Sequence, residues 1–465
     1  MVHLPLGLLL LCSTFFTSGV EAQQQCRLQL NNELSMPTSV VPLSPNSSSP
    51  SPTTPSAIPS RTPFNYGTDI VRGVNLGGWF VLEPWITPSI FEEYDATIVD
   101  EFTLGMQTTD YNATLSMLQN HWDTWITEAD FAAISAAGLN HVRIPFGYWS
   151  VPLTSSDTNT STSTSPYIPG AWPYLLRALN WAAAYDIHVI LDLHGAPGSQ
   201  NGYDNSGQRT SNPQWALNAQ NVTRTVDTLV YVAEQIGGMI DILEVLNESA
   251  GFLSTTWANV TRSFYSAAYT AVRNAVGGSL NVMIGDAFLG VDAWTGFLTF
   301  PSGENVLMDN HEYQIFDIPQ LQLSFSQHLA ATCPIRSMLS SFGASNIWTI
   351  QGEWSTSPTD CATWLNGRGI GARWDNSING GPPNGSCTGW TGNYTSFSSS
   401  FKTFLRQYWE AQVDVGENAQ GWIYWAWKTE SADEWSYQKG LEGGWVPSDP
   451  TERMYPDPCS NSTTS

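Results

Sequence analysis

The stretch that decides the fold is residues 239–249, MIDILEVLNES. It is rich in Ile, Leu and Val, and it ends abruptly at Asn247 and Glu248, before the turn residues 249–251. An apolar run of this length between turn residues predicts a strand buried on both faces, and such strands belong to parallel sheets covered by helices. We therefore expect a buried parallel strand that ends at Glu248.

A second segment has the same form. Residues 346–355, NIWTIQGEWS, are apolar up to Ile350 and deliver Glu353 at the end of the run. In a (β/α)8 barrel the catalytic groups lie at the C-terminal ends of the strands, and hydrolysis of a glycosidic bond requires two carboxylates at one such rim. The competing interpretation is that Glu248 and Glu353 are helix-capping or surface residues, because a Glu after an apolar run is a weak signal by itself.

Strand and helix signals alternate about eight times along the chain. The expected strands lie near 71–80, 140–144, 187–193, 239–248, 281–284, 306–308, 346–353 and 421–427. The expected helices lie near 110–126, 128–138, 172–185, 222–236, 257–276, 321–339 and 397–417. About 250 residues suffice for one (β/α)8 barrel. We therefore predict the α/β class, with a single (β/α)8 TIM barrel that carries long loops at its C-terminal face.

The composition limits the possible partners. The chain of 465 residues has 41 acidic and 17 basic residues, for a formal charge of −24. This charge argues against nucleic acid or an anionic membrane as a partner, but it leaves a neutral polymer open. The 21 Trp, 17 Tyr and 19 Phe residues suit stacking on sugar faces, although most single rings are expected in the core. We expect a monomer.

The N-terminal region predicts export. Residues 4–16 are apolar and small residues follow up to Ala22, which is typical of a secretory signal over 1–22. Residues 23–63 contain a Pro/Ser/Thr-rich stretch and are expected to be a disordered segment before a catalytic domain at 64–465. No later stretch has the roughly 18 to 20 apolar residues of a membrane helix, and the polar C-terminus lacks a lipid-anchor signal. We expect a secreted protein, extracellular or in a cell wall.

The cysteines and sequons fit an oxidising compartment. After loss of the signal, Cys26, Cys333, Cys361, Cys387 and Cys459 remain. Two disulfides among the last four are expected, with Cys26 free or paired between chains. Metal binding is the weaker interpretation because CxxC and HxxxH spacings are missing. Sequons lie at Asn46, Asn112, Asn159, Asn221, Asn259, Asn384, Asn393 and Asn461. Asn247 also begins a sequon but should stay unmodified at a barrel rim.

The two glutamates would divide the chemistry between them. Glu248, with its acid form favoured by burial and nearby negative charge, would protonate the leaving oxygen, while ionised Glu353 attacks the anomeric carbon. Arg143 lies inside an expected buried strand, so it needs a carboxylate partner, and near Glu353 it would keep that group charged. Asn247 would hydrogen-bond the sugar 2-hydroxyl. This chemistry requires neither a metal nor a cofactor.

Histidines and aromatic residues near strand ends are further candidates. A histidine in a strand is more often a hydrogen-bonded structural residue, but His194 and His311, unlike His188, each follow an apolar run and precede a loop. Tyr313 should point to the same side as His311, so its hydroxyl could reach the nucleophile. The same alternation would place both Trp425 and Trp427 on one face, where barrel packing is the alternative role.

Several sequence blocks, taken together, resemble those of one known family. They are RGVNLGGWFVLEPW (72–85), HVRIPFGYW (141–149), LDLHGAPGSQNGYDNSG (191–207), LNE (246–248), DNHEYQIF (309–316), GEWS (352–355) and GWIYWAWKTE (421–430). The blocks are collinear, and the similarity covers residues 64–459. They resemble the signature blocks of the fungal exo-β-1,3-glucanases of glycoside hydrolase family 5.

The resemblance implies a role for each matching residue. It implies a retaining (β/α)8 hydrolase with Glu248 as acid/base and Glu353 as nucleophile, supported by Arg143, His194, Asn247, His311 and Tyr313. It implies that Glu83, Trp85, Asp204, Asn205 and Trp425 hold the terminal glucose, and that Tyr203 and Phe316 form an aromatic clamp. It also implies a disulfide between Cys361 and Cys387, which leaves Cys333 with Cys459.

The resemblance also implies a substrate. We expect a secreted enzyme that releases glucose from the non-reducing ends of β-1,3-glucan with retention. A β-1,6-glucanase or a broader β-glucosidase is the alternative within the same chemistry. An inactive glucan-binding wall protein is the alternative from another class, and the intact Glu248, Glu353, Arg143 and His311 disfavour it.

Overall fold

The structure, a computed structural model, describes residues 61–157, 161–380 and 383–460. The expected signal peptide, most of the Pro/Ser/Thr-rich segment, Cys26 and the sequons at Asn46, Asn159 and Asn461 lie outside these ranges. Within them, the backbone amide of Thr62 donates to Asp186 Oδ1 at 2.6 Å, just before the expected start of the catalytic domain at residue 64. No helix in the described ranges has the length and apolar character needed to cross a membrane.

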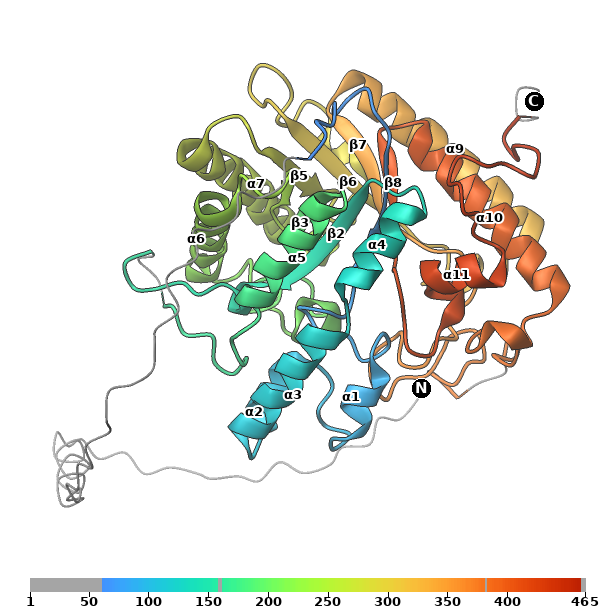
Figure 1. Cartoon of the computed structure of the whole chain (residues 1–465), viewed down its shortest axis with the longest axis horizontal. Coiled ribbons are helices and arrows are strands. Elements are labelled where there is room, and N and C mark those ends of the chain that lie inside the picture. The colour runs from blue at the N-terminus through green and yellow to red at the C-terminus, as the bar shows by residue number, and fades with distance from the viewer. Residues whose placement is uncertain (1–60, 158–160, 381–382, 461–465) are drawn as a thin grey trace, which may run out of the picture. The chain divides into compact units, whose positions relative to one another are not determined.

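The described residues form a closed barrel of parallel strands, which confirms the predicted fold class (Figure 1). The strands are β1 (Val71–Asn75), β2 (His141–Gly147), β3 (His188–Gly195), β4 (Ile242–Glu244), β5 (Asn281–Gly285), β6 (Val306–Glu312), β7 (Trp348–Trp354) and β8 (Gly421–Tyr424). Each strand pairs with the next in parallel, and β8 pairs with β1 to close the barrel.

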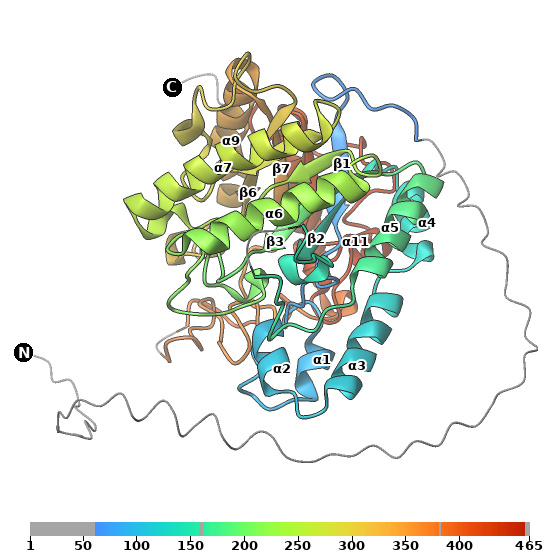
Figure 2. The same ribbon diagram turned by 90° about the vertical axis from the view of Figure 1, so that its left-hand side faces the viewer.

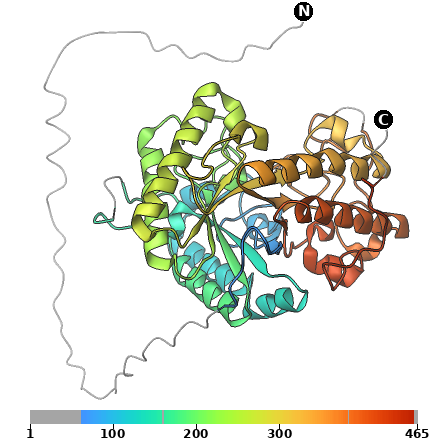
Figure 3. The same cartoon turned by 90° about the horizontal axis from the view of Figure 1, so that it is seen from above.

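Helices cover the outside of the barrel and its C-terminal end. They are α1 (Pro88–Glu92), α2 (Glu101–Gln107), α3 (Tyr111–Thr124), α4 (Glu128–Ala136), α5 (Trp172–Ala184), α6 (Ala219–Ile236), α7 (Thr255–Val276), α8 (Ile318–Leu321), α9 (Phe325–Ser345), α10 (Ser399–Glu417) and α11 (Tyr437–Gly443). Short 3-10 turns are η1 (Tyr148–Ser150), η2 (Asp204–Ser206), η3 (Gly251–Leu253), η4 (Val291–Trp294), η5 (Tyr394–Ser396) and η6 (Asp433–Trp435). Figure 2 shows α6 and α7 side by side, and Figure 3 shows the same for α9 and α10. The sequence did not predict α1, α2, α8 or α11, which are all short.

A layer of apolar side chains fills the interior of the barrel. Seven strands contribute one buried apolar residue each to a shared cluster: Val71, Ile190, Ile242, Met283, Leu307, Ile350 and Ile423. Phe64 and Tyr66 pack against this cluster from the N-terminal side. Filled layers of this kind make the barrel a packed core. The predicted site residues lie beyond this layer, at the C-terminal ends of the strands.

Three strands end before the expected ranges do, and the first of them is β1, which ends at Asn75. β4 ends at Glu244 instead of Glu248, because the amide of Asn247 leaves the regular ladder to donate to Leu193. Glu248 then has φ +46°, in the left-handed region that non-glycine residues rarely adopt. Glu248 therefore extends from a turn beyond the strand.

The end of β8 overturns the predicted placement of the two tryptophans. β8 ends at Tyr424, and the Trp425–Ala426 peptide bond is cis. Trp425 lines the cavity at the C-terminal end of the barrel. The indole of Trp427 instead donates to Asp130 of α4 at 2.9 Å. The prediction that both rings share one face is wrong, and Trp427 is a packing residue.

Two disulfides hold the C-terminal half together. Cys333 of α9 bonds to Cys459, and Cys361 bonds to Cys387 in the long segment that follows β7. The predicted pairing is confirmed. The second disulfide ties down the segment that supplies Leu365, Asn366 and Arg373 to the cavity wall.

Candidate active site

A cavity of about 430 Å³ opens at the C-terminal end of the barrel. Its walls include predicted sugar-binding and catalytic residues: Glu83, Trp85, Tyr203, Asp204, Asn205, Glu248, Tyr313, Phe316, Glu353 and Trp425. The sequence did not single out the remaining lining residues: Phe252, Phe288, Leu365, Asn366, Arg373 and Trp435. Four predicted residues lie outside the lining. Two of them contact its glutamates directly: Arg143 bonds to Glu353, and His311 bonds to Glu248. The other two are linked through Arg143, which bonds to Asn247, which in turn contacts His194.

The two predicted catalytic glutamates face each other in this cavity. A carboxylate oxygen of Glu248, one of Glu353 and a ring nitrogen of His311 all lie within 4.8 Å of one another. Retaining glycosidases hold their carboxyl groups about 5 to 5.5 Å apart, whereas inverting enzymes need about 6.5 to 9.5 Å to admit a water. The spacing therefore matches the retaining class.

Arg143 organises the floor beneath Glu353. Its Nη1 donates to Glu353 Oε1 at 2.8 Å and to Asn75 Oδ1 at 3.0 Å, and its Nε donates to Glu244 Oε2 at 2.7 Å. Its Nη2 lies 3.0 Å from Asp192 Oδ2. These carboxylates raise the pKa of the buried Arg143 guanidinium well above its ordinary value, although burial itself opposes this. Arg143 is therefore a fixed cation that orients Glu353.

The pairing of β6 with β7 brings His311 opposite Glu353. The register shifts between Asn310 and His311, so that His311 pairs with Glu353. Gly352 makes room for this arrangement, because a Cβ there would meet Asp309 Oδ1 at 2.0 Å. Asp309 Oδ1 instead accepts a hydrogen bond from the Gly352 amide at 2.7 Å.

His311 lies between the two glutamates. Its Nδ1 lies 2.9 Å from Glu248 Oε1 and 3.4 Å from Glu353 Oε2, and its Nε2 lies 3.0 Å from Asp309 Oδ2. Burial lowers the pKa of His311, but Glu353 and Asp309 outweigh burial and raise that pKa well above its ordinary value. His311 is thus a cation that can donate to both carboxylates of the pair.

In the free site the pKa values of the two glutamates shift in directions opposite to those expected, while their catalytic roles stay a prediction. Burial raises the pKa of Glu353 to about 8, against the opposing effects of His311 and Arg143. The pKa of Glu248 is lowered, because hydrogen bonds from His311 and Asn205 together with the His311 charge outweigh its burial. In the free site the pKa values of the two carboxyl groups are therefore shifted in opposite directions, and that of Glu353 is the higher.

Tyr313 and Asn205 each donate to one member of the pair. The Tyr313 hydroxyl donates to Glu353 Oε2 at 3.0 Å, as its position two residues after His311 predicts. Asn205 Nδ2 donates to Glu248 Oε2 at 2.8 Å, so its contact in the structure is with this glutamate. Each carboxylate is thus oriented by donors that leave it facing the cavity.

His194 and Asn247 form a layer below the cavity. His194 Nδ1 lies 2.6 Å from Asp192 Oδ2, and its ring stacks on Trp425 with centroids 5.6 Å apart. Asn247 Oδ1 accepts from Arg143 at 2.8 Å, and its side chain is buried. A glycan on Asn247 has no room in the folded protein. Burial also holds the pKa of His194 well below its ordinary value, so His194 is a neutral support for Trp425.

Two further carboxyl groups face the cavity with spare acceptor capacity. Glu83 accepts from the Trp85 indole at 3.1 Å through Oε2. Glu83 Oε1 and Asp204 Oδ2 are buried and have no hydrogen-bond partner among the described residues. Burial raises the pKa of Asp204 to about 7 and that of Glu83 well above its ordinary value. Buried oxygens without partners are costly, so these two are suited to ligand hydroxyl groups.

Aromatic rings surround the mouth of the cavity. Tyr203 and Phe316 are 46% and 44% exposed, which suits contact with a ligand. Trp85 packs edge-on against Trp435, with ring centroids 5.0 Å apart. Rings of this kind present flat apolar faces to a sugar.

The sequence reasoning missed three carboxylates of the floor: Asp192, Glu244 and Asp309. A signal for two of them was present, because Asp192 lies two residues before His194 and Asp309 lies two residues before His311. Side chains two apart in a strand share a face, so each predicted histidine implied its partner. Glu244 carried no such signal, because the end of β4 was misplaced.

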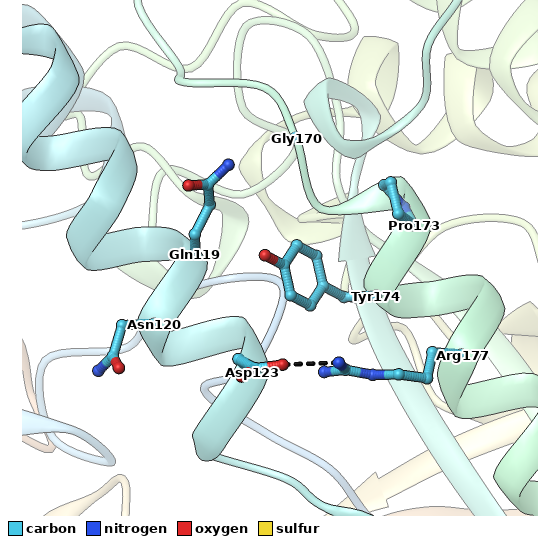
Figure 4. Close-up of a pocket in the computed structure, with 7 residues that line it drawn as sticks. All are labelled: Gln119, Asn120, Asp123, Gly170, Pro173, Tyr174 and Arg177. Atoms are coloured by element: carbon cyan, nitrogen blue, oxygen red, sulfur yellow. Dashed lines mark hydrogen bonds and ion pairs between the residues drawn. The ribbon is translucent and has the colours of Figure 1, made fainter. Parts of the chain in front are cut away.

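The volume of a cavity alone does not identify the candidate active site. A hollow of about 540 Å³ lies between α3 and α5, lined by Gln119, Asn120, Asp123, Gly170, Pro173, Tyr174 and Arg177 (Figure 4). Its one carboxylate, Asp123, is paired with Arg177 at 2.6 Å. The smaller cavity at the barrel end is the one that combines two facing carboxylates with unpaired acceptors.

Comparison with known proteins agrees with this geometry. Residues 104–396 match the family described as "Cellulase (glycosyl hydrolase family 5)". "Glucan 1,3-beta-glucosidase" of Blumeria graminis is 40% identical over 417 residues, which cover 86% of this chain and 92% of that protein. "Glucan 1,3-beta-glucosidase 2" of Wickerhamomyces anomalus is 40% identical over 418 residues, which cover 85% and 92%.

Solved structures support the fold alone. The rutinosidase from Aspergillus niger superposes with a TM-score of 0.63 at 20% identity, and the match covers 83% of this chain and 100% of that one. At this identity the barrel architecture is shared, while the substrate cannot be transferred.

Proposed function

Because the chain belongs to glycosyl hydrolase family 5, we propose that it is a retaining glucan 1,3-β-glucosidase, which releases glucose from the non-reducing ends of β-1,3-glucan. The names of relatives that are 40% identical over more than four fifths of the chain support the substrate. The observation that carries the mechanism is the spacing of Glu248 and Glu353, whose nearest oxygens lie within 4.8 Å of each other and of His311.

In the first step, Glu353 attacks the anomeric carbon from the face opposite the glycosidic oxygen. The bond between that carbon and the oxygen breaks, Glu248 gives its proton to the leaving oxygen, and a glucosyl ester forms on Glu353. Arg143 and Tyr313 donate to Glu353 and favour its ionised form, which is the form that attacks. Glu248 holds the proton that the leaving oxygen receives.

In the second step, Glu248 acts as a base. It takes a proton from a water molecule, the water oxygen bonds to the anomeric carbon, and the ester bond to Glu353 breaks. β-Glucose leaves, and Glu248 holds a proton again. His311 donates to Glu248 throughout, which keeps this carboxyl directed at the bond being cut.

The sugar-binding residues favour a single terminal glucose. Glu83 and Asp204 each offer a buried oxygen without a protein partner to the hydroxyl groups of that glucose. Trp425 supplies a flat face beneath it, and Tyr203 and Phe316 flank the next sugar at the mouth. We assign recognition of the terminal unit to these residues.

The disulfides bear on where the enzyme works. Two disulfides in the described residues favour an oxidising compartment, since thiols stay reduced in the cytosol. We infer secretion, with a β-glucan as the partner of the folded enzyme.

The test of the substrate is a product profile. With laminarin, glucose should be the first product, and proton NMR should show it as the β-anomer before mutarotation. A ladder of oligosaccharides would contradict the exo assignment. Faster hydrolysis of the β-1,6-linked pustulan would change the assigned linkage from β-1,3 to β-1,6 without changing the proposed mechanism.

The test of the two roles uses azide with alanine variants and a 2,4-dinitrophenyl β-glucoside. Glu353→Ala removes the nucleophile, so azide should attack directly and give the α-glucosyl azide. Glu248→Ala still forms the ester, so azide should give the β-glucosyl azide. The reverse pattern of products would exchange the two roles.

A further inference from the structure

A second cavity lies beside the catalytic pair, at the ends of β5 and β6. It has a volume of about 270 Å³, and its lining includes Glu244, Glu248, Asp286, Asn310, His311 and Glu312. We call it the side cavity. Glu248 and Phe288 line both this cavity and the sugar-binding cavity. The side cavity therefore reaches the acid/base residue by a route other than the sugar entrance.

The side cavity connects the surface with the interior of the barrel. Asp286, Gly290 and Glu312 in its lining are partly exposed, whereas Asp309 and Glu244 are buried. Burial raises the pKa of Glu312 to about 8, so this outer carboxyl is neutral over most of the acidic range. The walls therefore combine carboxyl and amide groups with the apolar side chains of Phe288 and Met338.

A buried amide in this cavity has an unused acceptor. Asn310 is 4% exposed, and its Nδ2 donates to Asp286 Oδ2 at 3.0 Å. Its Oδ1 is buried and has no hydrogen-bond partner in the part of the chain that the structure describes. Polar cavities of this size hold several ordered waters, which bond to such atoms. Water is therefore the ligand that this chemistry fits.

We propose that the side cavity supplies the water that hydrolyses the glucosyl–enzyme. This inference rests on the double displacement described above. In that step Glu248 takes one proton of the water, the water oxygen bonds to the anomeric carbon, and the bond to Glu353 breaks. The side cavity delivers the water to Glu248 while the aromatic mouth is occupied by the departing glucan.

The consequence is that water and sugar acceptors enter by different routes. The proposal assigns the sugar acceptor to the mouth between Tyr203 and Phe316, where the departing glucan leaves, and the water to the side cavity. Blocking the side cavity should therefore slow hydrolysis and leave transfer of glucose to a sugar acceptor unchanged. The residues at the ends of β5 and β6, which line the side cavity, would then set the ratio of glucose transfer to hydrolysis.

Two variants block the side cavity in different ways. Asn310→Leu keeps a similar size and removes the polar amide. Met338→Phe adds volume from α9, which contributes to the lining. Met338→Leu is the matched control, because it keeps an apolar residue there without added volume. Thermal unfolding of all three variants checks that the barrel is intact.

The experiment uses 2,4-dinitrophenyl β-glucoside, whose good leaving group makes the second step the slow one. For Met338→Phe and Asn310→Leu, hydrolytic kcat should fall by about tenfold, on the scale of losing an ordered water network. Transfer to saturating laminaribiose and the initial burst of dinitrophenol should match the wild type. Met338→Leu should resemble the wild type in all three measurements.

Two results would overturn the proposal: equal losses of hydrolysis and transfer, or no loss of either in both blocking variants. Failure of the underlying mechanism has a different signature. In that case the wild-type enzyme itself would release α-glucose or show no glucosyl–enzyme by mass spectrometry.

Discussion

The two ends of the barrel contain the same kinds of side chain in opposite states of pairing. At the N-terminal end, His188 Nδ1 lies 2.8 Å from Asp241 Oδ1, and Arg61 lies 2.9 Å from Asp241 Oδ2. The Tyr66 hydroxyl lies 2.8 Å from His141 Nε2. These groups form a closed set of polar contacts.

At the C-terminal end the set is open. His311 lies between two carboxylates, and Glu83 and Asp204 each keep an oxygen without a partner in the described residues. Complete pairing stabilises a fold, whereas a buried group left unpaired must be compensated by a ligand. The difference shows that histidines and acids in a barrel strand are informative only once their partners are known.

Loss of the nucleophile should give the largest effect. Glu353→Gln keeps the shape of the side chain but removes the nucleophilic charge, so kcat on laminarin should fall by about 10⁵-fold. Binding of laminarin, measured by calorimetry, should be largely retained. Activity within a factor of ten of the wild type would show that Glu353 is not the nucleophile. The C-terminal end of the barrel would then not differ from the N-terminal end in catalytic role.

Replacing Glu83, which has an unpaired carboxyl oxygen in the described residues, should reduce activity less than replacing the nucleophile. Glu83→Gln retains an oxygen for Trp85 but weakens the hydrogen bonds to sugar hydroxyls. We expect kcat/KM on laminarin to fall by about tenfold to a hundredfold, the scale of leaving one buried hydrogen-bonding group unsatisfied. Equal kinetics for this variant and the wild type would show that Glu83 is a structural residue, as the paired groups at the other end are.

The carboxyl groups at the C-terminal end of the barrel should also make the thermal stability of the fold depend on pH. A carboxyl with a raised folded-state pKa stabilises the fold at low pH, and this contribution is lost as the pH rises through that pKa. The pKa is about 7 for Asp204 and about 8 for Glu353, since burial raises both. The midpoint of thermal unfolding should therefore fall between pH 6.5 and pH 8.

The variant Asp204→Asn isolates one contribution to this pH dependence. Its unfolding midpoint should fall less steeply over the same interval, because one titrating group has been removed. Calorimetric scans at pH 6.5, 7.25 and 8 measure the slope. A midpoint that rises with pH in the wild-type enzyme would contradict the assigned direction.

A substitution among the paired polar groups at the N-terminal end of the barrel should have the smallest effect on activity. Asp241→Asn weakens the contacts to His188 and Arg61, so the free energy of unfolding should fall by about 1 to 3 kcal/mol. The kcat on laminarin should stay at the wild-type value at 25 °C. A large loss of kcat in a folded variant would show that the two ends are coupled.

Most of the barrel could be predicted from the sequence, because a strand buried on both faces is recorded as a run of apolar residues. The run at 187–193 gave β3 to within two residues at its C-terminal end. The run at 239–249 misled at its end, because residues after Glu244 remain buried without staying in the ladder. Apolar character reports burial, and it does not report where the ladder of hydrogen bonds stops.

The candidate site was predictable to the extent that its residues follow strands or match family blocks. That reasoning placed Glu248, Glu353 and Tyr313 in one cavity. It missed Phe252 and Phe288, because an exposed aromatic residue in a loop carries no periodic signal. It also did not anticipate the directions of the pKa shifts of the pair, because these depend on distances between residues at the ends of β4, β6 and β7.

The sequence by itself determined the alternation of strands and helices, the family resemblance and the prediction that Glu248 and Glu353 form the catalytic pair, because each is recorded in local residue order. Only the tertiary structure decided that His311 lies between these glutamates, that their pKa values shift in opposite directions, and that a side cavity reaches Glu248. The reason is that pKa values, cavities and unpaired atoms depend on contacts between residues far apart in the chain, and those contacts exist only once the barrel has closed.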